Sequence, residues 1–343
     1  MAERFTLTGT PAGGQAPART RTGEPPRVPE AAAGPPAPTR PAPGPGFAGT
    51  LAGGLLLTVR PRQWVKNLLV VAAPAAAGQL ASWHTVLRLG LVFVLFTAAA
   101  SAVYLLNDAR DVEADRAHPD KCRRPVAAGT VPVPLAYALG AALAVAATTA
   151  AALLCNPATA TLLAGYVVMQ IAYCLLLKRI LVVDLAVVTA GFVMRAMSGG
   201  LALEIPLSRW FLITAGFGAL FMVAGKRYSE AVLMGEGEGG TRALLRDYSV
   251  GYLRFVWQLA AGVAVLAYCL WALEADGGGH AGAAGALWRQ LSMVPLILAV
   301  LRYAVFADRG AAGSPEDVLL RDRPLAVTAL CWGLLYGLSV AGL

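Results

Sequence analysis

The sequence predicts an all-α, polytopic membrane protein, a bundle of about nine transmembrane helices. Of its 343 residues, 57% are hydrophobic and only 14% are charged, and the mean hydropathy is +0.61. Soluble domains are close to half apolar and a quarter charged. So few charged side chains cannot cover a soluble surface of this size. This excludes a water-soluble enzyme, a disordered protein and a nucleic-acid-binding protein.

The first 50 residues are expected to form a disordered tail. Half of the 22 prolines fall before residue 47, mixed with alanine and glycine, and this stretch shows no apolar periodicity. It also lacks the continuous apolar core of a secretory signal. We therefore expect two regions, a disordered tail over 1–50 and a transmembrane domain over 51–343.

From Leu51 onward, apolar stretches alternate with short charged loops. The stretches are about 15–24 residues long, close to the length that a helix needs to cross a bilayer. Glycines inside them, Gly199, Gly200, Gly216 and Gly218, are expected to allow close helix packing. The nine predicted helices cover residues 64–80, 84–107, 132–154, 157–177, 183–203, 209–227, 251–273, 288–307 and 324–342.

Lysine and arginine are distributed unequally between the loops. In this topology 18 of them lie on one side and three, Arg88, Arg209 and Arg289, on the other. Cytoplasmic loops keep an excess of positive charge. The distribution predicts a multi-pass protein of the cell membrane with a cytoplasmic N-terminus and an external C-terminus.

An acidic motif, N-D-A-R-D-V-E-A-D, stands at the cytoplasmic end of the second predicted helix, with Asn107, Asp108, Asp111 and Asp115. Its offsets of three, four and seven residues place the aspartates on one helical face. Such carboxylates repel one another unless a cation neutralises them, and Mg²⁺ prefers oxygen ligands together with substrate phosphates. We predict a catalytic set of these four residues, with the three aspartates binding a Mg²⁺-bound diphosphate. The alternative is a solvated helix end.

Basic residues flank this motif at the same membrane face. Arginine and lysine supply charge that complements phosphate oxygens, although plain positive-inside charge is the alternative. Arg195 falls within a helix, where an arginine is costly unless it faces a polar cavity or reaches an interface. The predicted substrate-binding residues are Arg60, Arg62, Lys66, Asn67, Lys121, Arg123, Arg124, Lys178, Arg195, Lys226 and Arg227.

The aspartate motif is followed by H-P-D-K-C-R-R-P. In a membrane protein of about nine helices, this combination resembles the UbiA superfamily of intramembrane prenyltransferases. The resemblance implies a UbiA-like bundle with a cytoplasm-facing active-site cavity, in which two acidic motifs position Mg²⁺ on the donor diphosphate. The first motif is complete here. The second region keeps Asp184, a further substrate-binding candidate, but has Val188 where another carboxylate would be expected.

Three further segments sharpen the resemblance: R-P-R-Q-W-V-K-N, D-L-A-V-V-T-A-G-F-V-M-R-A-M-S-G-G and G-K-R-Y-S-E. Together with the aspartate motif they are similar to the actinobacterial phosphoribosyltransferase branch of the superfamily, from about Thr58 to the C-terminus. That branch implies 5-phosphoribose 1-diphosphate as donor, a polyprenyl phosphate such as decaprenyl phosphate as acceptor, membrane lipid around the bundle, and a product used for cell-envelope arabinose synthesis. A homo-oligomer is compatible with this interpretation.

Two alternatives remain at this point. A prenyltransferase with an aromatic acceptor would share the first motif, but Val188 and the added bases count against it. A transporter of an anionic solute or lipid would show internal repeats and ionisable residues in both halves, whereas the acids here gather at one helix end.

Overall fold

The computed structural model describes residues 49–234, 247–274, 283–313, 318 and 321–341. All regular secondary structure in these residues is helical, as predicted. Seven helical segments among them are long and apolar enough to cross a membrane. The tail predicted over 1–50 lies outside the described residues, apart from its last two.

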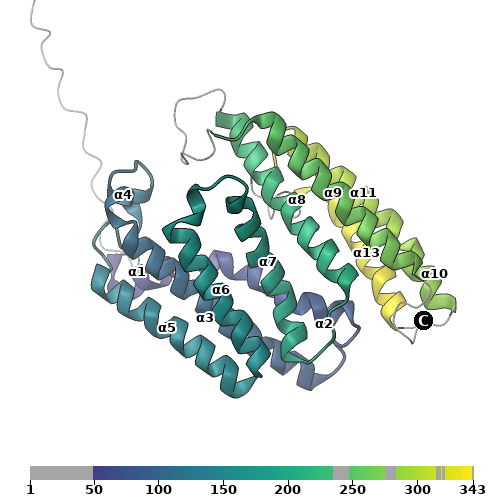
Figure 1. The fold of residues 1–343 in the computed structure, drawn as a ribbon, viewed down its shortest axis with the longest axis horizontal. Coiled ribbons are helices and arrows are strands. Elements are labelled where there is room, and N and C mark those ends of the chain that lie inside the picture. Colours follow the sequence, from purple (N-terminus) through teal and green to yellow (C-terminus); the bar gives the residue numbers. More distant parts are fainter. Residues whose placement is uncertain (1–48, 235–246, 275–282, 314–317, 319–320, 342–343) are drawn as a thin grey trace, which may run out of the picture. The chain divides into compact units, whose positions relative to one another are not determined.

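The helices follow one another along the chain in the order drawn in Figure 1. They are α1 (Leu51–Thr58), η2 (Pro61–Val71), α2 (Ala72–Ala76), α3 (Trp83–Arg110), α4 (Val112–Arg116), η3 (Lys121–Arg123), α5 (Val133–Leu154), α6 (Pro157–Leu175), η4 (Leu177–Arg179), α7 (Val183–Ala202), α8 (Arg209–Met234), α9 (Val250–Leu273), α10 (Ala283–Leu291), α11 (Met293–Asp308) and α13 (Arg323–Ala341).

The seven candidate spans are α3, α5, α6, α7, α9, α13 and the segment Ala284–Asp308, which consists of α10 and α11 together. They match seven of the nine predicted helices within a few residues. The helix predicted over 209–227 exists as α8 and is 26 residues long. It is not among the seven, and its C-terminal part carries Lys226, Arg227 and Glu230.

The helix predicted over 64–80 is wrong as a single α-helix. A 3₁₀ helix, η2, runs over Pro61–Val71 and is followed by the short α2. Pro74 cannot donate the N–H that an α-helix would direct to the carbonyl of Val70. That carbonyl lies against Gly199 of α7 instead, so close that a β-carbon there would lie 1.9 Å from the Val70 oxygen. The apolar pattern identified the segment, but Pro74 and the packing against α7 changed its helix type.

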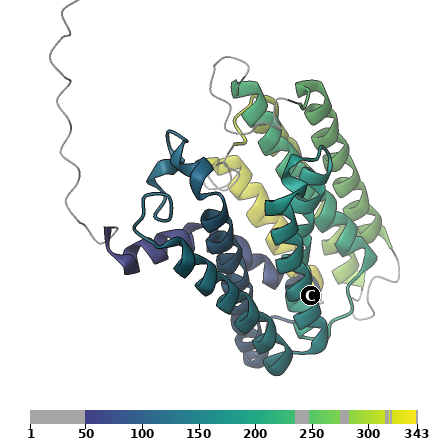
Figure 2. The same ribbon diagram turned by 60° about the vertical axis from the view of Figure 1, so that its left-hand side comes forward.

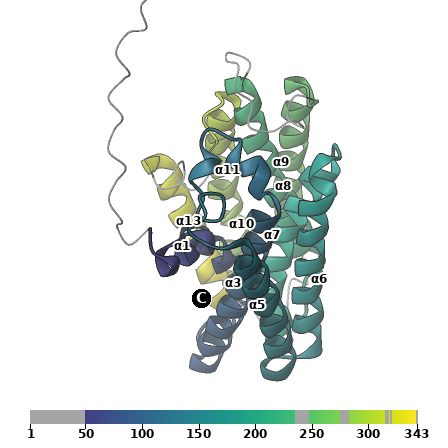
Figure 3. The ribbon, with the colours of Figure 1, turned by 90° about the vertical axis from the view of Figure 1, so that its left-hand side faces the viewer.

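Helix α3 is the central element of the first group of helices. It packs against α5, α6, α7 and η2, and Figure 3 shows α3 and α5 side by side. Apolar lipid gives packed helices no hydrophobic driving force, so close packing by small residues matters more. The run Ala99–Ala102 on α3 is almost completely buried and allows this approach.

A second group of helices is joined to the first through α7. Helix α7 packs against α8, α8 against α9, and α11 against α8, α9 and α13. The core of this second group contains the aromatic residues Phe221, Tyr228, Trp257 and Tyr303. Asp184, near the start of α7, therefore lies where both groups contribute side chains.

The basic loop after α4 is fixed to the end of α3. Val126 and Val131 are fully buried and pack with Leu105 and Ala109 of α3. Figure 2 shows α4 and this loop seated at the C-terminal end of α3. Apolar anchoring thus fixes the backbone of a charged loop beside the acidic motif.

Candidate active site

Asp108 is the most enclosed carboxylate of the acidic motif. Its side chain is 2% exposed and accepts a hydrogen bond at Oδ1 from Arg60 Nη2 at 2.7 Å and another from Arg124 Nη1 at 3.3 Å. Arg60 also lies over the ring of Tyr104, at 4.6 Å from its centre. The backbone of Arg60 is left-handed, with φ of 55°, which costs a non-glycine residue energy. The chain thus adopts an unfavourable conformation where it directs this guanidinium onto Asp108.

Asp115 and Asp111 are paired with different bases. Asp115 Oδ2 accepts a hydrogen bond from Arg124 Nη1 at 2.8 Å, so one guanidinium nitrogen contacts two buried carboxylates. Asp111 Oδ2 accepts from Lys178 Nζ at 3.0 Å. These contacts bring η2, α3, α4, the basic loop and η4 together at one end of the bundle.

The continuous helical face predicted for the three aspartates is interrupted. Helix α3 ends at Arg110, Asp111 stands between it and α4, and α4 contains Asp115. The amides of Asp111 and Asp115 still donate to carbonyls four residues earlier. The turn is therefore close to helical, yet Asp111 turns toward Lys178 while Asp108 and Asp115 share Arg124.

The other predicted bases are less tightly placed. Arg62 and Arg123 are exposed, whereas Lys66, Lys121 and Lys226 are half-buried. Asn107, the fourth residue of the predicted catalytic set, is also half-buried and lies beside the Asp108 carboxyl. The structure thus brings three of the predicted bases, Arg60, Arg124 and Lys178, onto the acids of the motif.

Asp184 forms a second buried charge cluster. Arg227 of α8 donates to both of its oxygens, from Nε to Oδ2 at 3.2 Å and from Nη2 to Oδ1 at 3.3 Å, and Tyr173 donates to Oδ1 at 2.5 Å. Both charged side chains are at least 93% buried. Val188, where the resemblance would place another carboxylate, packs against the apolar core. Asp184 is thus neutralised by the protein itself.

A strained turn fixes the start of α7 beside this cluster. Val182 has φ of 68°, and the amide of Val183 donates to the carbonyl of Leu181, which is the hydrogen bond of a γ-turn. The amide of Val182 donates to the Tyr248 hydroxyl at 2.6 Å. Burial raises the pKa of the Tyr248 phenol, so it stays neutral as an acceptor.

Breaking the Asp184–Arg227 pair should be costly. Asp184→Asn leaves a buried guanidinium charge without its main partner, and such changes lower the free energy of unfolding by about 3–5 kcal/mol. Arg227→Gln should cost a similar amount, and the double variant much less than the two together. Unfolding in detergent, measured as a double-mutant cycle, checks this. Additive losses would contradict a coupled pair.

Arg195 lies in a polar cluster within the apolar part of the bundle. Its side chain donates to Asn67 Oδ1 at 2.9 Å, to the Gly191 carbonyl at 2.7 Å and to the Tyr166 hydroxyl at 2.6 Å. Asn67 in turn donates to Thr97 on α3 at 3.0 Å. No carboxylate within the described part of the chain pairs with Arg195. The arginine therefore joins η2, α3, α6 and α7 through neutral groups and does not snorkel to an interface.

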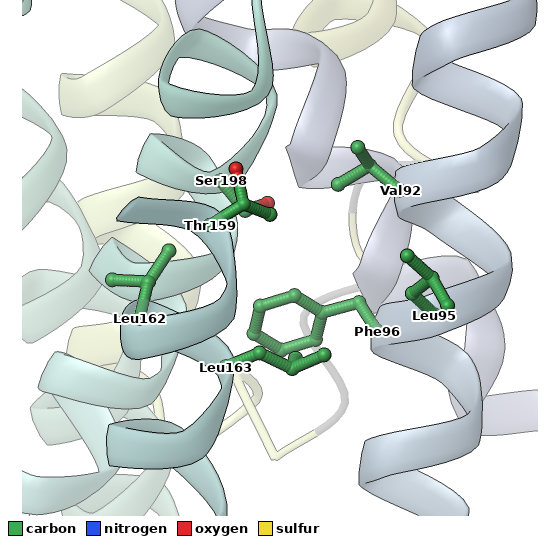
Figure 4. A pocket seen from close by; sticks show the side chains of 7 residues that line it. All are labelled: Val92, Leu95, Phe96, Thr159, Leu162, Leu163 and Ser198. Carbon is green, nitrogen blue, oxygen red and sulfur yellow. The ribbon is translucent and has the colours of Figure 1, made fainter. Parts of the chain in front are cut away.

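A narrow apolar crevice borders this cluster. Figure 4 shows the side chains that line it, with Phe96 pointing across toward α6. Phe96 also lies beneath the Arg195 guanidinium, 5.2 Å from its ring centre. The crevice is too narrow to hold a water molecule. The aromatic ring thus shields Arg195 on this side. The lining residues are Val92, Leu95, Phe96, Thr159, Leu162, Leu163 and Ser198.

Replacement of Arg195 tests its role in joining the helices. Arg195→Met leaves the Asn67 oxygen and the Tyr166 hydroxyl without their donor, whereas the Gly191 carbonyl lies within α7 and keeps its helical backbone donor. Each unpaired buried polar group costs about 1–3 kcal/mol, so we expect a loss of roughly 2–4 kcal/mol in the free energy of unfolding. The exposed Arg62→Met should change it by less than about 0.5 kcal/mol. Equal stability of both variants would contradict this role.

Two site residues, Tyr166 and Tyr173, were not predicted from the sequence. They lie seven residues apart on α6 and share one face, from which one hydroxyl contacts Arg195 and the other Asp184. A buried tyrosine hydroxyl normally finds a polar partner. Two tyrosines at helical spacing in an otherwise apolar span were therefore an available signal for a polar interior.

The arrangement of acids fits a divalent cation in part. Within the described residues, no group of three or more Asp, Glu, His or Cys side chains is arranged to hold a metal ion. Asp108 Oδ1 and Asp115 Oδ2 nevertheless face the same point, which Arg124 Nη1 occupies at 3.3 Å from the first oxygen and 2.8 Å from the second. Mg²⁺ commonly takes one or two carboxylates and fills its other positions with water and substrate phosphates. The pair fits such an ion when phosphate accompanies it.

Comparison with known protein families identifies this architecture. Residues 68–319 match the model of the UbiA prenyltransferase family. The chain belongs to the UbiA prenyltransferase family. It is therefore an enzyme, a membrane transferase, and the transporter alternative is set aside.

Similar proteins include decaprenyl-phosphate phosphoribosyltransferases of the genera Mycobacterium, Mycolicibacterium and Corynebacterium. The protein from Mycobacterium tuberculosis is 49% identical over 295 residues, which cover 85% of this chain and 95% of the relative. That from Corynebacterium glutamicum is 46% identical over 286 residues, covering 82% and 85%. These relatives confirm the resemblance to the phosphoribosyltransferase branch.

Solved structures confirm the fold. A UbiA homolog from Archaeoglobus fulgidus, bound to DMAPP and Mg²⁺, superimposes with a TM-score of 0.61 at 16% identity and covers 84% of this chain and all of the homolog. A structure of digeranylgeranylglyceryl phosphate synthase gives 0.59 at 14% identity, covering 85% and 99%. At these identities the likeness concerns the fold alone.

Proposed function

We propose that this enzyme transfers 5-phosphoribose from 5-phosphoribose 1-diphosphate to a polyprenyl phosphate, such as decaprenyl phosphate, and releases diphosphate. The observation that carries this proposal is the set of three bases from separate segments, Arg60, Arg124 and Lys178, that gather on the acidic motif. A donor with phosphates at both ends needs more cationic partners than a prenyl diphosphate. The names of the phosphoribosyltransferase relatives support the same donor and acceptor.

The exposure of the three bases supports a role in binding the donor. Their side chains are 29–31% exposed, whereas the Asp108 and Asp115 side chains are 2% and 6% exposed. The cations can therefore reach an incoming phosphate while the acids stay in place. Arginine can also bind two phosphate oxygens at once. A magnesium ion held by Asp108 and Asp115 would stabilise negative charge on the departing diphosphate.

The transfer reaction requires no nucleophilic side chain. A phosphate oxygen of the acceptor forms a bond to the anomeric carbon of ribose, while the bond from that carbon to the diphosphate oxygen breaks. The acceptor is already an anion, so no side chain has to remove a proton from it. The residues of this chain act by binding and orientation, and by electrostatic stabilisation of the leaving group.

We place the acidic motif at the cytoplasmic face of the cell membrane. Arg60, Lys178 and Arg227 from three separate segments all bind acids at that end of the bundle, and cytoplasmic ends carry such excess positive charge. The donor is a water-soluble cytoplasmic metabolite, whereas the acceptor stays in the lipid. The N-terminus is then cytoplasmic and the C-terminus external, and the product would feed arabinose donor synthesis for the cell envelope.

One assay tests the proposal. Purified protein in detergent with Mg²⁺ is given radiolabelled 5-phosphoribose 1-diphosphate and decaprenyl phosphate, and lipid extraction measures the labelled product. We expect labelled lipid that depends on both substrates and disappears with EDTA. A protein that makes none, but transfers a prenyl group from its diphosphate to an aromatic acceptor, would overturn the proposal in favour of the other family chemistry.

A further inference from the structure

One guanidinium nitrogen, Nη1 of Arg124, contacts both buried carboxylates of the acidic motif. It lies 3.3 Å from Asp108 Oδ1 and 2.8 Å from Asp115 Oδ2. A divalent ion that used these carboxylates would therefore compete with this nitrogen for the same negative charge. Two cations cannot share so small a space without strong repulsion.

The charges around the pair are already balanced. Asp108 and Asp115 carry two negative charges, and Arg60 and Arg124, their ion-pair partners, carry two positive ones. A divalent ion alone would leave an excess of two positive charges in a mostly buried place. Such an excess is unfavourable unless a base leaves or an anion arrives with the metal.

The side chain of Arg124 is free to change partners while its backbone stays in place. Its side chain is 29% exposed, against 2% and 6% for the two acids. Its amide donates to the Lys121 carbonyl at 2.9 Å, its own carbonyl accepts from Ala128 at 2.8 Å, and the nearby Val126 is fully buried. A long flexible side chain on a fixed backbone can exchange one anionic partner for another without refolding the loop.

We propose that Arg124 holds the metal position between Asp108 and Asp115 until a diphosphate arrives, and then transfers its contact to the phosphate. This rests on the metal and diphosphate assigned under the proposed function. The enzyme would thus bind a divalent ion weakly by itself and more tightly together with diphosphate. Arg124 is a positioning residue that makes the two binding events depend on each other.

Metal binding without any substrate tests the exchange. Mn²⁺ is titrated into the purified protein in detergent, and electron paramagnetic resonance of the free ion gives the dissociation constant. We expect Arg124→Gln to bind Mn²⁺ about tenfold more tightly than the unaltered protein. Arg124→Lys, which keeps the charge but loses the fork, should give a smaller gain. Equal or weaker binding by Arg124→Gln would overturn the proposal.

The control variant is Arg116→Gln. Arg116 lies in the same region, where it pairs with the exposed Glu113 at 3.0 Å and donates from Nε to the Ala127 carbonyl at 3.2 Å. It forms no ion pair with Asp108 or Asp115 in the described part of the chain, so its loss should leave the Mn²⁺ dissociation constant unchanged. A second measurement, retention of labelled diphosphate at saturating Mg²⁺, should show weaker binding by Arg124→Gln. Because neither readout depends on the sugar donor, failure of the phosphoribosyl assay and failure of this proposal remain distinguishable.

Discussion

Asp108→Asn is expected to lower the rate of transfer by about 10²–10³-fold, the loss typical when one preorganised electrostatic group is removed from an active site. Asp108 is the acid to which two arginines from different segments, Arg60 and Arg124, donate. The variant keeps the shape of the side chain but removes its charge, so both bases lose a partner and a divalent ion loses a ligand. The radiolabelled lipid assay measures the effect.

Glu113→Gln is the matched control for Asp108. Glu113 belongs to the same motif, but its side chain is 83% exposed, and among the residues that the structure describes it pairs with Arg116 alone. Its rate should stay within about twofold of the unaltered protein, because exposed pairs contribute little. Full activity of Asp108→Asn, with correct folding, would remove this carboxylate from the mechanism.

Gly199→Ala is expected to lower the free energy of unfolding by about 3 kcal/mol or more, at or above the upper end of the usual cost of overpacking. The new β-carbon would lie 1.9 Å from the Val70 carbonyl oxygen and 2.8 Å from Leu89. The first contact is with backbone, which cannot rotate away. Helix α7 and η2 would have to separate, and the Arg195–Asn67 hydrogen bond joins these same two segments. Unfolding in detergent and the yield of folded protein measure this.

Gly218→Ala provides the comparison. A β-carbon at Gly218, on α8, meets nothing within 4 Å. Alanine favours a helix over glycine by up to about 1 kcal/mol, so this variant should be neutral or slightly more stable. Equal stability of Gly199→Ala and Gly218→Ala would contradict the close approach of the Val70 carbonyl to α7.

The glycines of the helices show what the sequence pattern could not predict about helix packing. Four glycines were predicted to allow close approach, and the structure confirms this for Gly199 and Gly200, whose β-carbons would lie within 3 Å of neighbours. Gly218 has no neighbour within 4 Å, and Gly216 has only an ordinary contact at 3.8 Å, so that prediction is wrong for both. The sequence shows that a residue is small, but not which helix passes beside it.

The first predicted helix illustrates a second limit. Hydrophobic length identified the segment over 64–80, and Pro74 is visible in the sequence. Pro74 removes the helical donor for the Val70 carbonyl, and this carbonyl packs instead against Gly199, which is 129 positions away. A proline and long-range packing thus act together on this segment, whereas the proline-free α3 and the largely apolar α5 formed helices close to their predicted bounds.

The sequence by itself determined the membrane class, most of the helices, the acidic motif and its surplus of bases, because hydrophobic length and the type and spacing of charged residues are local properties. Only the tertiary structure decided the partners. It paired Asp111 with Lys178, and Asp184 with Arg227 and Tyr173. It also placed Arg124 between Asp108 and Asp115. Lys178 lies 67 positions from Asp111, and Arg227 lies 43 positions from Asp184, because a buried charge takes whichever opposite charge the packing brings within reach.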